Sequence, residues 1–198
     1  MNKKVKRTLQ GILFILIIIA FIYIGTRDFS TKVIVDNEKF DSEYSNVSKD
    51  NVFVYVNAQD VYTKMKSGNA VIFMGFPSNK WSGYYANLLN EAAKQVGIRE
   101  ILYYDFKSDR ENKNATYQSI VLKLANYAPT LDDGTQDIYA PTLIVIKKGK
   151  IMYYDNETAI NIGNIKPENY WDDYRKGIKI SNLRVMFEDY LGIRPEVN

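Results

Sequence analysis

Three short stretches of the chain are almost wholly apolar, and each predicts a β-strand. Residues 52–56 combine β-branched and aromatic side chains between polar neighbours, a pattern typical of strands. Residues 70–75 are apolar or small without interruption, which favours a strand covered on both faces. Residues 101–106 are also mainly apolar and contain two adjacent tyrosines. The three runs predict the centre of a sheet.

Between these strands, apolar residues recur three or four positions apart, which is the spacing of one helix face. The pattern predicts helices at 58–66, 83–96 and 117–124. Glycine follows the first two at positions 68 and 97, where helices commonly end. The charged segment 108–115 is expected to be a loop.

The C-terminal half predicts a hairpin and closing helices. Residues 142–146 and 151–154 have strand character, and Lys148-Gly149 between them suits a tight turn. Pro167 suits the first position of a helix, and apolar spacing predicts another helix at 181–190. The order β-α-β-α-β-α-β-β-α indicates an α/β fold with a central mixed sheet and helices on both faces.

The first 27 residues differ from the rest of the chain. A basic cluster precedes residues 8–26, which carry no charge over about 19 positions, close to the ~20 that span a bilayer as a helix. A cleavable signal peptide is the alternative, but bulky residues at 21–24 fill the place of a small-residue cleavage site. We expect an uncleaved transmembrane signal anchor at residues 1–27. A polar tether at 28–50 follows, in which 31–35 could form a short edge strand.

The distribution of charge predicts how this anchor is oriented across the membrane. Residues 1–27 hold five of the 26 Lys and Arg residues and no acidic residue, which leaves 21 basic against 23 acidic residues, a net charge of −2, for the rest. Because basic flanks stay on the cytoplasmic side, we expect a single-pass cell-membrane protein with a cytoplasmic N-terminus and an extracytoplasmic domain. The basic excess belongs to the anchor and gives no reason to expect a nucleic-acid partner.

The composition removes the usual chemistry of enzymes. The 198 residues include no cysteine and no histidine. Thiol nucleophiles, thiolate metal sites, histidine bases and histidine zinc ligands are therefore excluded. Only a hard cation held by oxygen ligands remains conceivable, and Asp132-Asp133 and residues 155–157 lack the spacing of a calcium loop. We expect no enzyme activity, no metal and no cofactor.

Residues 75–82 form the most specific motif in the chain. Their sequence, Gly-Phe-Pro-Ser-Asn-Lys-Trp-Ser, follows the apolar run 70–75 and opens the predicted helix 83–96. It resembles the Gly-Phe-Pro-Ser-Cys-Pro-Trp-Cys stretch of small bacterial membrane-anchored thioredoxin-like proteins, among them the bacteriocin-transport accessory proteins. The similarity covers residues 50 to 160 approximately, with the tryptophan in register. Asn79 and Ser82 stand where both redox cysteines would be.

This resemblance implies a thioredoxin-like domain at 51–160 and a C-terminal helical extension at 161–198. Disulfide exchange needs a thiolate at the helix N-terminus and a second thiol that resolves the mixed disulfide. Neither Asn79 nor Ser82 supplies one, so thiol–disulfide exchange is not possible at this site. A natural loss is favoured over an engineered replacement, because Asn79 and Lys80 are unusual substitutes for Cys and Pro.

The resemblance also implies a binding groove. Ala140-Pro141-Thr142 matches the family's cis-proline loop, which would lie beside residues 79–82 and pair with an extended peptide by strand addition. A proline that starts an edge strand is the simpler alternative. The candidate partner-binding residues are Ser78, Lys80, Trp81, Ala140, Pro141 and Thr142.

Structural roles for some of these residues stay open. Asn79 is a favourable helix N-cap without any further function. Trp81 either forms a partner contact together with Lys80 or covers the end of the sheet. The aromatic and acidic cluster at 170–174 either packs the C-terminal helix onto the domain or presents a partner surface.

The sequence thus predicts a redox-inactive, membrane-tethered, extracytoplasmic protein that binds a protein or peptide partner in an accessory or assembly role. The alternative is a structural subunit of a membrane complex that acts through its anchor and C-terminal helices. Residual oxidoreductase activity is the least favoured, because it requires a thiol.

Overall fold

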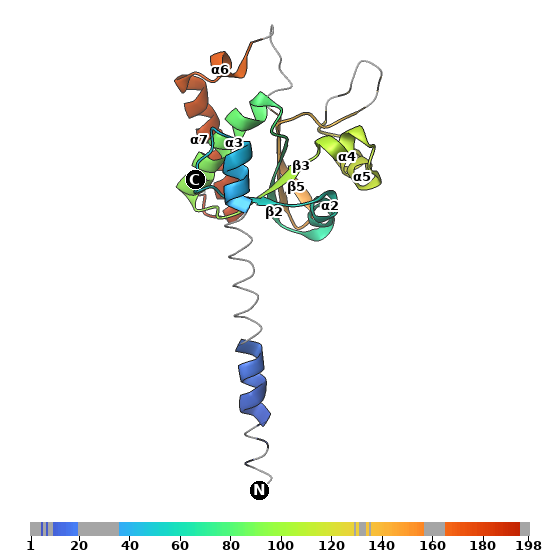
Figure 1. Cartoon of the computed structure of the whole chain (residues 1–198), viewed down its shortest axis with the longest axis vertical. Coiled ribbons are helices and arrows are strands. Elements are labelled where there is room, and N and C mark those ends of the chain that lie inside the picture. The colour runs from blue at the N-terminus through green and yellow to red at the C-terminus, as the bar shows by residue number, and fades with distance from the viewer. Residues whose placement is uncertain are drawn as a thin grey trace. The chain divides into compact units, whose positions relative to one another are not determined.

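The computed structural model describes residues 5, 7, 10–19, 36–128, 130, 134, 136–156 and 165–194. The chain divides into two units, Met1–Asp36 and Asn37–Asn198. In the first unit, residues 10–19 are helical (Figure 1). Within the described residues, no helix is long and apolar enough to cross a membrane. The remainder of the predicted anchor and the predicted strand at 31–35 lie outside the described residues.

A five-stranded sheet forms the centre of the second unit (Figure 1). Its strands are β1 (Phe53–Tyr55), β2 (Ala70–Gly75), β3 (Ile101–Asp105), β4 (Thr142–Lys147) and β5 (Lys150–Asp155). They lie in the order β1-β3-β2-β4-β5. Strand β3 is parallel to both β1 and β2, whereas β4 is antiparallel to both β2 and β5. The predicted mixed α/β sheet and its hairpin are therefore confirmed.

Helices cover both faces of this sheet. They are α2 (Ala58–Ser67), α3 (Lys80–Val96), α4 (Lys107–Glu111), α5 (Ala115–Lys123), α6 (Pro167–Tyr170) and α7 (Asp173–Leu191), and residues 36–43 are also helical. One apolar cluster joins the sheet to α3, α7 and the 36–43 helix, and a second joins the other face to α2 and α5. Alternation along β2 explains the division, because Val71 and Phe73 belong to the first cluster and Ile72 and Met74 to the second.

The segment expected to be a tether contributes to the core instead. Phe40, Tyr44 and Val47 are buried, and the Phe40 ring stacks on that of Phe53 with centroids 4.1 Å apart. The polar composition of 28–50 predicted a linker, but these three apolar residues are four and three positions apart, which is helical spacing. Phe40 lies in the helix 36–43 and packs on Phe53 of the edge strand β1, while Tyr44 and Val47 follow the helix in a turn.

The C-terminal residues form a layer of the same domain. Helix α6 begins at Pro167, as predicted, and α7 packs along α3. Leu183 and Phe187 on α7 are completely buried in the core. The extension expected at 161–198 therefore contributes to the domain core. A further difference is α4, which occupies part of the predicted loop at 108–115.

Candidate functional site

A tight connection between β2 and α3 carries the motif at 75–82. The chain turns at Pro77-Ser78, and Asn79 caps α3 by accepting a hydrogen bond from the Ser82 backbone N–H at 3.0 Å. The predicted capping role of Asn79 is confirmed. A Cβ at Gly75 would lie 2.9 Å from Ser82 Oγ, so only glycine allows this close approach of α3 to the end of β2.

Asn79 also joins this connection to the loop before β4. Its side-chain Nδ2 donates to the Ala140 carbonyl oxygen over 3.2 Å. The Ala140–Pro141 peptide bond is cis, as the sequence predicted. Two segments 61 positions apart in the chain therefore meet at the N-terminus of α3.

The side chains of Ala140, Pro141 and Thr142 are not available to a partner, because all three are buried. The Thr142 hydroxyl donates to the Tyr139 carbonyl at 2.6 Å and accepts from Asn156 Nδ2 at 3.1 Å. These three candidate residues thus shape the loop from within.

Trp81 covers the core and is not an exposed contact residue. Its half-buried ring packs against Tyr170, with ring centroids 5.2 Å apart. Tyr170 in turn meets the buried Trp171 ring edge to face at 4.9 Å. Of the alternatives left by the sequence, the packing roles of Trp81 and of the first residues of the 170–174 cluster match these contacts.

Ser82, at the second former cysteine position, is completely buried. Its hydroxyl oxygen has no hydrogen-bond partner among the described residues. A partner at the surface would not reach it. Ser78 is exposed and accepts a hydrogen bond from Lys107 Nζ at 3.2 Å.

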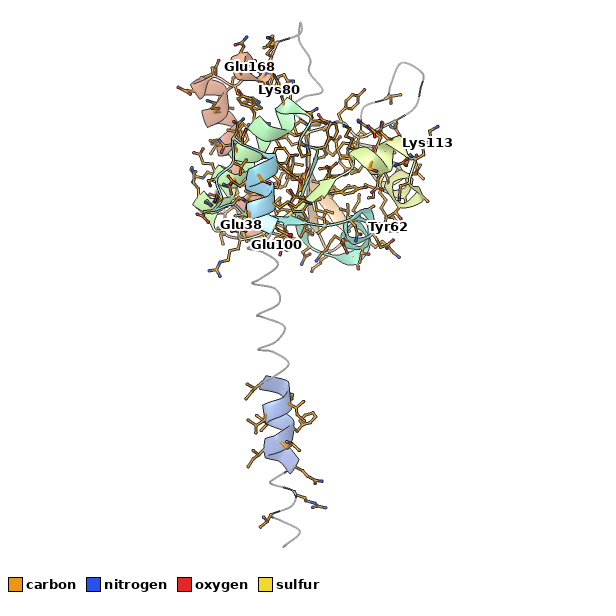
Figure 2. The ribbon with its side chains drawn as sticks, viewed as in Figure 1. Glu38, Tyr62, Lys80, Glu100, Lys113 and Glu168 are labelled. Atoms are coloured by element: carbon orange, nitrogen blue, oxygen red, sulfur yellow. The ribbon has the colours of Figure 1, made fainter. Side chains whose placement is uncertain are left out.

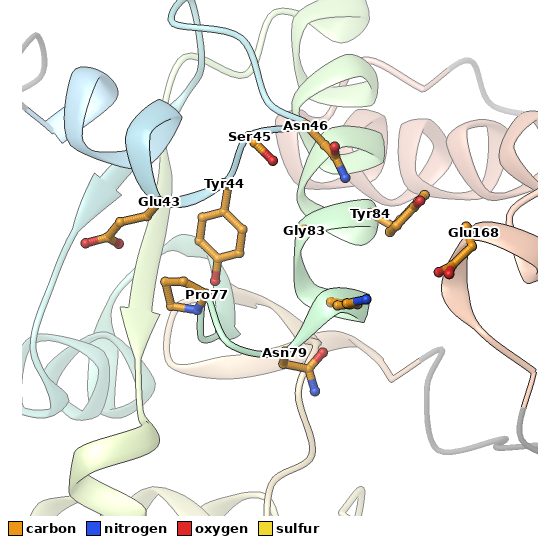
Figure 3. Close-up of a pocket in the computed structure, with 10 residues that line it drawn as sticks. Glu43, Tyr44, Ser45, Asn46, Pro77, Asn79, Gly83, Tyr84 and Glu168 are labelled. Carbon is orange, nitrogen blue, oxygen red and sulfur yellow. The ribbon is translucent and has the colours of Figure 1, made fainter.

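A pocket of about 420 Å³ opens beside the N-terminus of α3 (Figure 3). We call it the α3 pocket. Its lining comes from Glu43, Tyr44, Ser45, Asn46, Pro77, Asn79, Lys80, Gly83, Tyr84 and Glu168. Lys80 and Glu168 lie toward the same end of the domain (Figure 2). Three separate parts of the sequence therefore form this pocket.

Sequence reasoning found only Asn79 and Lys80 of this lining. It missed residues 43–46 because the segment 28–50 was interpreted as a tether, although the spacing of its apolar residues contained the signal of a packed helix. It missed Glu168 because nothing in the chain pattern indicates which side of the domain α6 covers.

The α3 pocket carries charges of both signs. Lys80 is exposed at its rim, while Glu43 accepts a hydrogen bond from the Tyr55 hydroxyl at 2.6 Å and lies 3.8 Å from Lys39 Nζ. Burial raises the pKa of Asp105 above its ordinary value, and the charge of Glu43 adds to this rise. A pocket with this mixture suits recognition by ionic and hydrogen bonds.

Tyr44, which lines the pocket, is hydrogen bonded to a second buried phenol, that of Tyr103. The hydroxyls of Tyr44 and Tyr103 lie 2.8 Å apart, and burial raises the pKa of both well above the ordinary value for tyrosine. Both therefore stay neutral at physiological pH and act as hydrogen-bonding groups. Among the described residues, no cluster of three or more Asp or Glu side chains is arranged to hold a metal ion.

The structure brings Asn79, Lys80 and the Ala140 backbone together, and adds Tyr84, Glu43 and Glu168 to the site. No protein-family model matches the chain. A search of curated proteins finds no relative.

Proposed function

We propose that this chain is a redox-inactive, thioredoxin-like protein that binds a segment of a partner protein at the α3 pocket. Residues 1–27 would tether it to a cell membrane, with the domain on the extracytoplasmic side. The strand order β1-β3-β2-β4-β5 and the reversed direction of β4 support the thioredoxin-like assignment. So does the meeting of the loop at 76–79 with the loop at 140–141, which the resemblance anticipated.

The α3 pocket is the observation that carries the proposal. Its volume of about 420 Å³ falls in the range of pockets that hold ligands or side chains of a partner, on the order of 300–1,000 Å³. Lys80, Tyr84 and Glu168 offer it a cation, an aromatic ring and a carboxylate. We infer an extended partner segment with polar and charged side chains.

Asn79 explains how the binding face persists without a thiol. In a redox relative, position 79 would hold the attacking cysteine at the helix N-terminus. Here the same position caps α3 and holds the Ala140 carbonyl, so both polar atoms of the side chain serve the framework. The chain thus retains the relation between the two loops while lacking the nucleophile.

A photo-crosslinking amino acid at Tyr84 of the full chain, in its native membrane, tests this proposal. We expect a discrete adduct with a partner protein at Tyr84 and none from the matched position Lys113, which is exposed away from the pocket (Figure 2). Lys80→Glu and Glu168→Lys should each lower the adduct yield at least tenfold while the domain stays folded. Equal yields from both positions, or an adduct insensitive to both changes, would contradict binding at the pocket.

A structural role through the C-terminal helices is the second candidate. Tyr174 and Ile178 are 76% and 45% exposed although both are large and apolar or aromatic, and they lie one turn apart on α7. A crosslinker at Tyr174 separates the candidates. An adduct there, with none at Tyr84, favours a subunit that assembles through α7.

The tether is tested separately by extraction of the full chain from membranes with alkaline carbonate. We expect the chain to stay in the membrane, because residues 8–26 contain no charged side chain. Leu16→Lys combined with Ile18→Lys should release it. Release of the unaltered chain would show that the tether is wrong without affecting the α3 pocket.

A further inference from the structure

We propose that the end of the domain opposite the α3 pocket binds anionic phospholipid headgroups of the membrane surface. The binding surface is a lysine patch, defined as Lys66, Lys123, Lys148 and Lys150. The choice of a membrane as the occupant rests on the proposed tether, whereas the patch itself is a feature of the domain.

The turn between β4 and β5 brings part of the lysine patch together. Lys148 donates its backbone N–H to Asn69 Oδ1 at 2.7 Å, and the next residue, Gly149, donates to the Gly68 carbonyl at 2.8 Å. A Cβ at Gly149 would lie 2.5 Å from the Lys66 carbonyl oxygen, so the turn sits directly on the end of α2. Lys66 and Lys148 are therefore held on one surface.

Helix α5 contributes Lys123 to the lysine patch. The ammonium groups of Lys66 and Lys123 lie 5.8 and 5.6 Å from the centroid of the Tyr62 ring. Lys123 and Lys150 both line a second pocket of about 420 Å³, with Met65, Asn126, Tyr127, Gly149 and Ile151 as its other lining residues. No acidic side chain lines this pocket.

The patch carries a net positive charge that its surroundings leave uncompensated. All four lysines are exposed, and none forms an ion pair with a carboxylate within the part of the chain that the structure describes. The C-terminal ends of α2 and α5 contribute only about half a negative charge each. This sum is far below four positive charges, so the lysines do more than complement two helix ends.

Exposed apolar and aromatic side chains lie near two of these cations, because Leu122 precedes Lys123 on α5 and Tyr127 lines the pocket shared by Lys123 and Lys150. Leu122 is 76% exposed and Tyr127 45% exposed, and Met152 on β5 is also exposed. Lysines beside exposed leucine and tyrosine are typical of surfaces that rest in the headgroup region of a bilayer, where aromatic rings and aliphatic chains enter the interface. A soluble anion would use the lysines but leave Leu122 without a role.

The path of the chain favours a membrane over a soluble acidic partner. Asn51, just before β1, donates its Nδ2 to the Asn37 carbonyl at 2.9 Å, so the domain begins at the end of the sheet where β1 and β2 start. Strand β4 runs antiparallel to β2, pairing Ala70 with Ile146, and therefore places the β4–β5 turn at that same end. Residues 27–36 reach at most about 35 Å. A tethered domain would keep this end near the bilayer.

A single fluorescent label reports on the patch directly, because the chain has no cysteine of its own. An environment-sensitive dye is attached to the full chain at Leu122→Cys, next to the patch, or at Glu111→Cys on α4 as a matched control. The labelled chains are reconstituted into vesicles of phosphatidylcholine alone or with one third phosphatidylglycerol. We expect a blue shift and quenching by a lipid-borne quencher at position 122 only, and only with the anionic vesicles.

Charge removal then decides whether the lysines cause this response. Lys123→Gln with Lys150→Gln should reduce the quenching at least fivefold on anionic vesicles, with an unchanged circular dichroism spectrum. High salt should have the same effect, because the attraction is electrostatic.

Several outcomes would overturn the inference. These are equal responses on neutral and anionic vesicles, a response that survives the lysine changes, or a response to soluble polyglutamate or inorganic phosphate but not to vesicles. The tether is scored separately by carbonate washing of the same vesicles. If the wash removes the chain, the tether fails, while the response measured before the wash still decides the lysine patch.

Discussion

Asn79 and Ser82, which replace the two cysteines of the resembling motif, have opposite environments. Both polar atoms of the Asn79 side chain are hydrogen bonded, to the Ser82 N–H and the Ala140 carbonyl. The Ser82 hydroxyl is buried beside Gly75 and has no hydrogen-bond partner within the described residues. A buried polar group without a partner costs free energy of about 1–3 kcal/mol. One position thus stabilises the site and the other destabilises it.

Ser82→Ala is therefore expected to stabilise the domain by about 1 kcal/mol, because it removes an unsatisfied hydroxyl from the core. Urea unfolding of both proteins measures the change in the free energy of unfolding. Ser119→Ala is the matched control, since the Ser119 hydroxyl donates to the Ala115 carbonyl at 3.0 Å and its removal should give no gain. A loss of stability in Ser82→Ala would indicate that this hydroxyl has a partner.

Asn79→Ala should destabilise the domain by about 1–2 kcal/mol, because it removes the cap of α3 and the bond to Ala140. Asn79→Ser should cost less, since serine caps helices well but is too short to reach Ala140. Thermal unfolding distinguishes the two variants. Equal losses would mean that the cap contributes nothing to stability, whereas a wild-type stability of Asn79→Ser would mean that the bond to Ala140 contributes nothing.

At the scale of elements, one polar cluster fixes α7 to the sheet. Lys179 Nζ lies 2.9 Å from Asp155 Oδ2 on β5, and the Tyr85 hydroxyl of α3 donates to the same oxygen at 2.5 Å. The Lys179 and Asp155 side chains are only 10% and 15% exposed. Three elements from both halves of the chain therefore share one largely buried carboxylate.

Lys179→Met is expected to lower the free energy of unfolding by about 3–5 kcal/mol, because it leaves the buried Asp155 without its cation. Adding Asp155→Asn should recover part of this loss. Lys176→Met is the control, since the Lys176–Asp173 pair at 3.4 Å is exposed and should contribute less than about 1 kcal/mol. Equal effects of Lys176→Met and Lys179→Met in urea unfolding would contradict a special role for the buried pair.

The sequence was sufficient for elements whose signal is local. The uninterrupted apolar run at 70–75, the Lys148-Gly149 turn and Pro167 each marked an element in the correct place. Helix α7 was predicted only over 181–190, because residues 173–177 contain no aliphatic side chain and the Asp172 cap that starts the helix acts through a backbone contact.

The candidate site was only partly predictable, for a physical reason. Asn79 and Lys80 belong to the motif itself, whereas Glu43 and Glu168 reach the α3 pocket through tertiary packing. The sequence left Trp81 with two alternatives, a partner contact or a cover for the end of the sheet, because no core residue near it was known. The packing of α6 supplies Tyr170 as its neighbour, and a chain pattern does not contain that contact.

At the scale of the whole molecule, tyrosine hydroxyls supply many of the polar side-chain contacts between elements, in a chain without cysteine or histidine. Tyrosine hydroxyls donate to carboxylates that join distant segments, including the pairs Tyr55–Glu43, Tyr85–Asp155, Tyr117–Asp137 and Tyr153–Asp189. Burial also raises the pKa of Tyr44, Tyr103, Tyr104 and Tyr117 above the ordinary value of 10.0. The folded domain thus favours neutral phenols.

This arrangement predicts alkaline unfolding. A raised pKa in the folded state contributes stability that is fully present below the unfolded value near pH 10 and is lost as the pH rises beyond it. Urea midpoints should fall steeply above about pH 10. Without histidine in the chain, no histidine step is expected between pH 5 and 8.

Tyr103→Phe should make the decline above pH 10 shallower, by up to about 1.4 kcal/mol per pH unit, because one buried phenol no longer ionises on unfolding. Tyr174→Phe, at an exposed position, should leave the slope unchanged. A wild-type slope in Tyr103→Phe would show that the buried phenols do not govern the alkaline transition.

The antiparallel pairing of β2 and β4 also sets the distance between the lysine patch and the α3 pocket, which lie at opposite ends of β2. Strand β2 has six residues, and a strand advances about 3.3 Å per residue, so its two ends are about 20 Å apart. If the lysine patch rests on lipid, the α3 pocket, near the opposite end of β2, stands about this far from the bilayer. A partner that is itself embedded in the membrane would then need an extracellular stem of about 20 Å or more to present its segment.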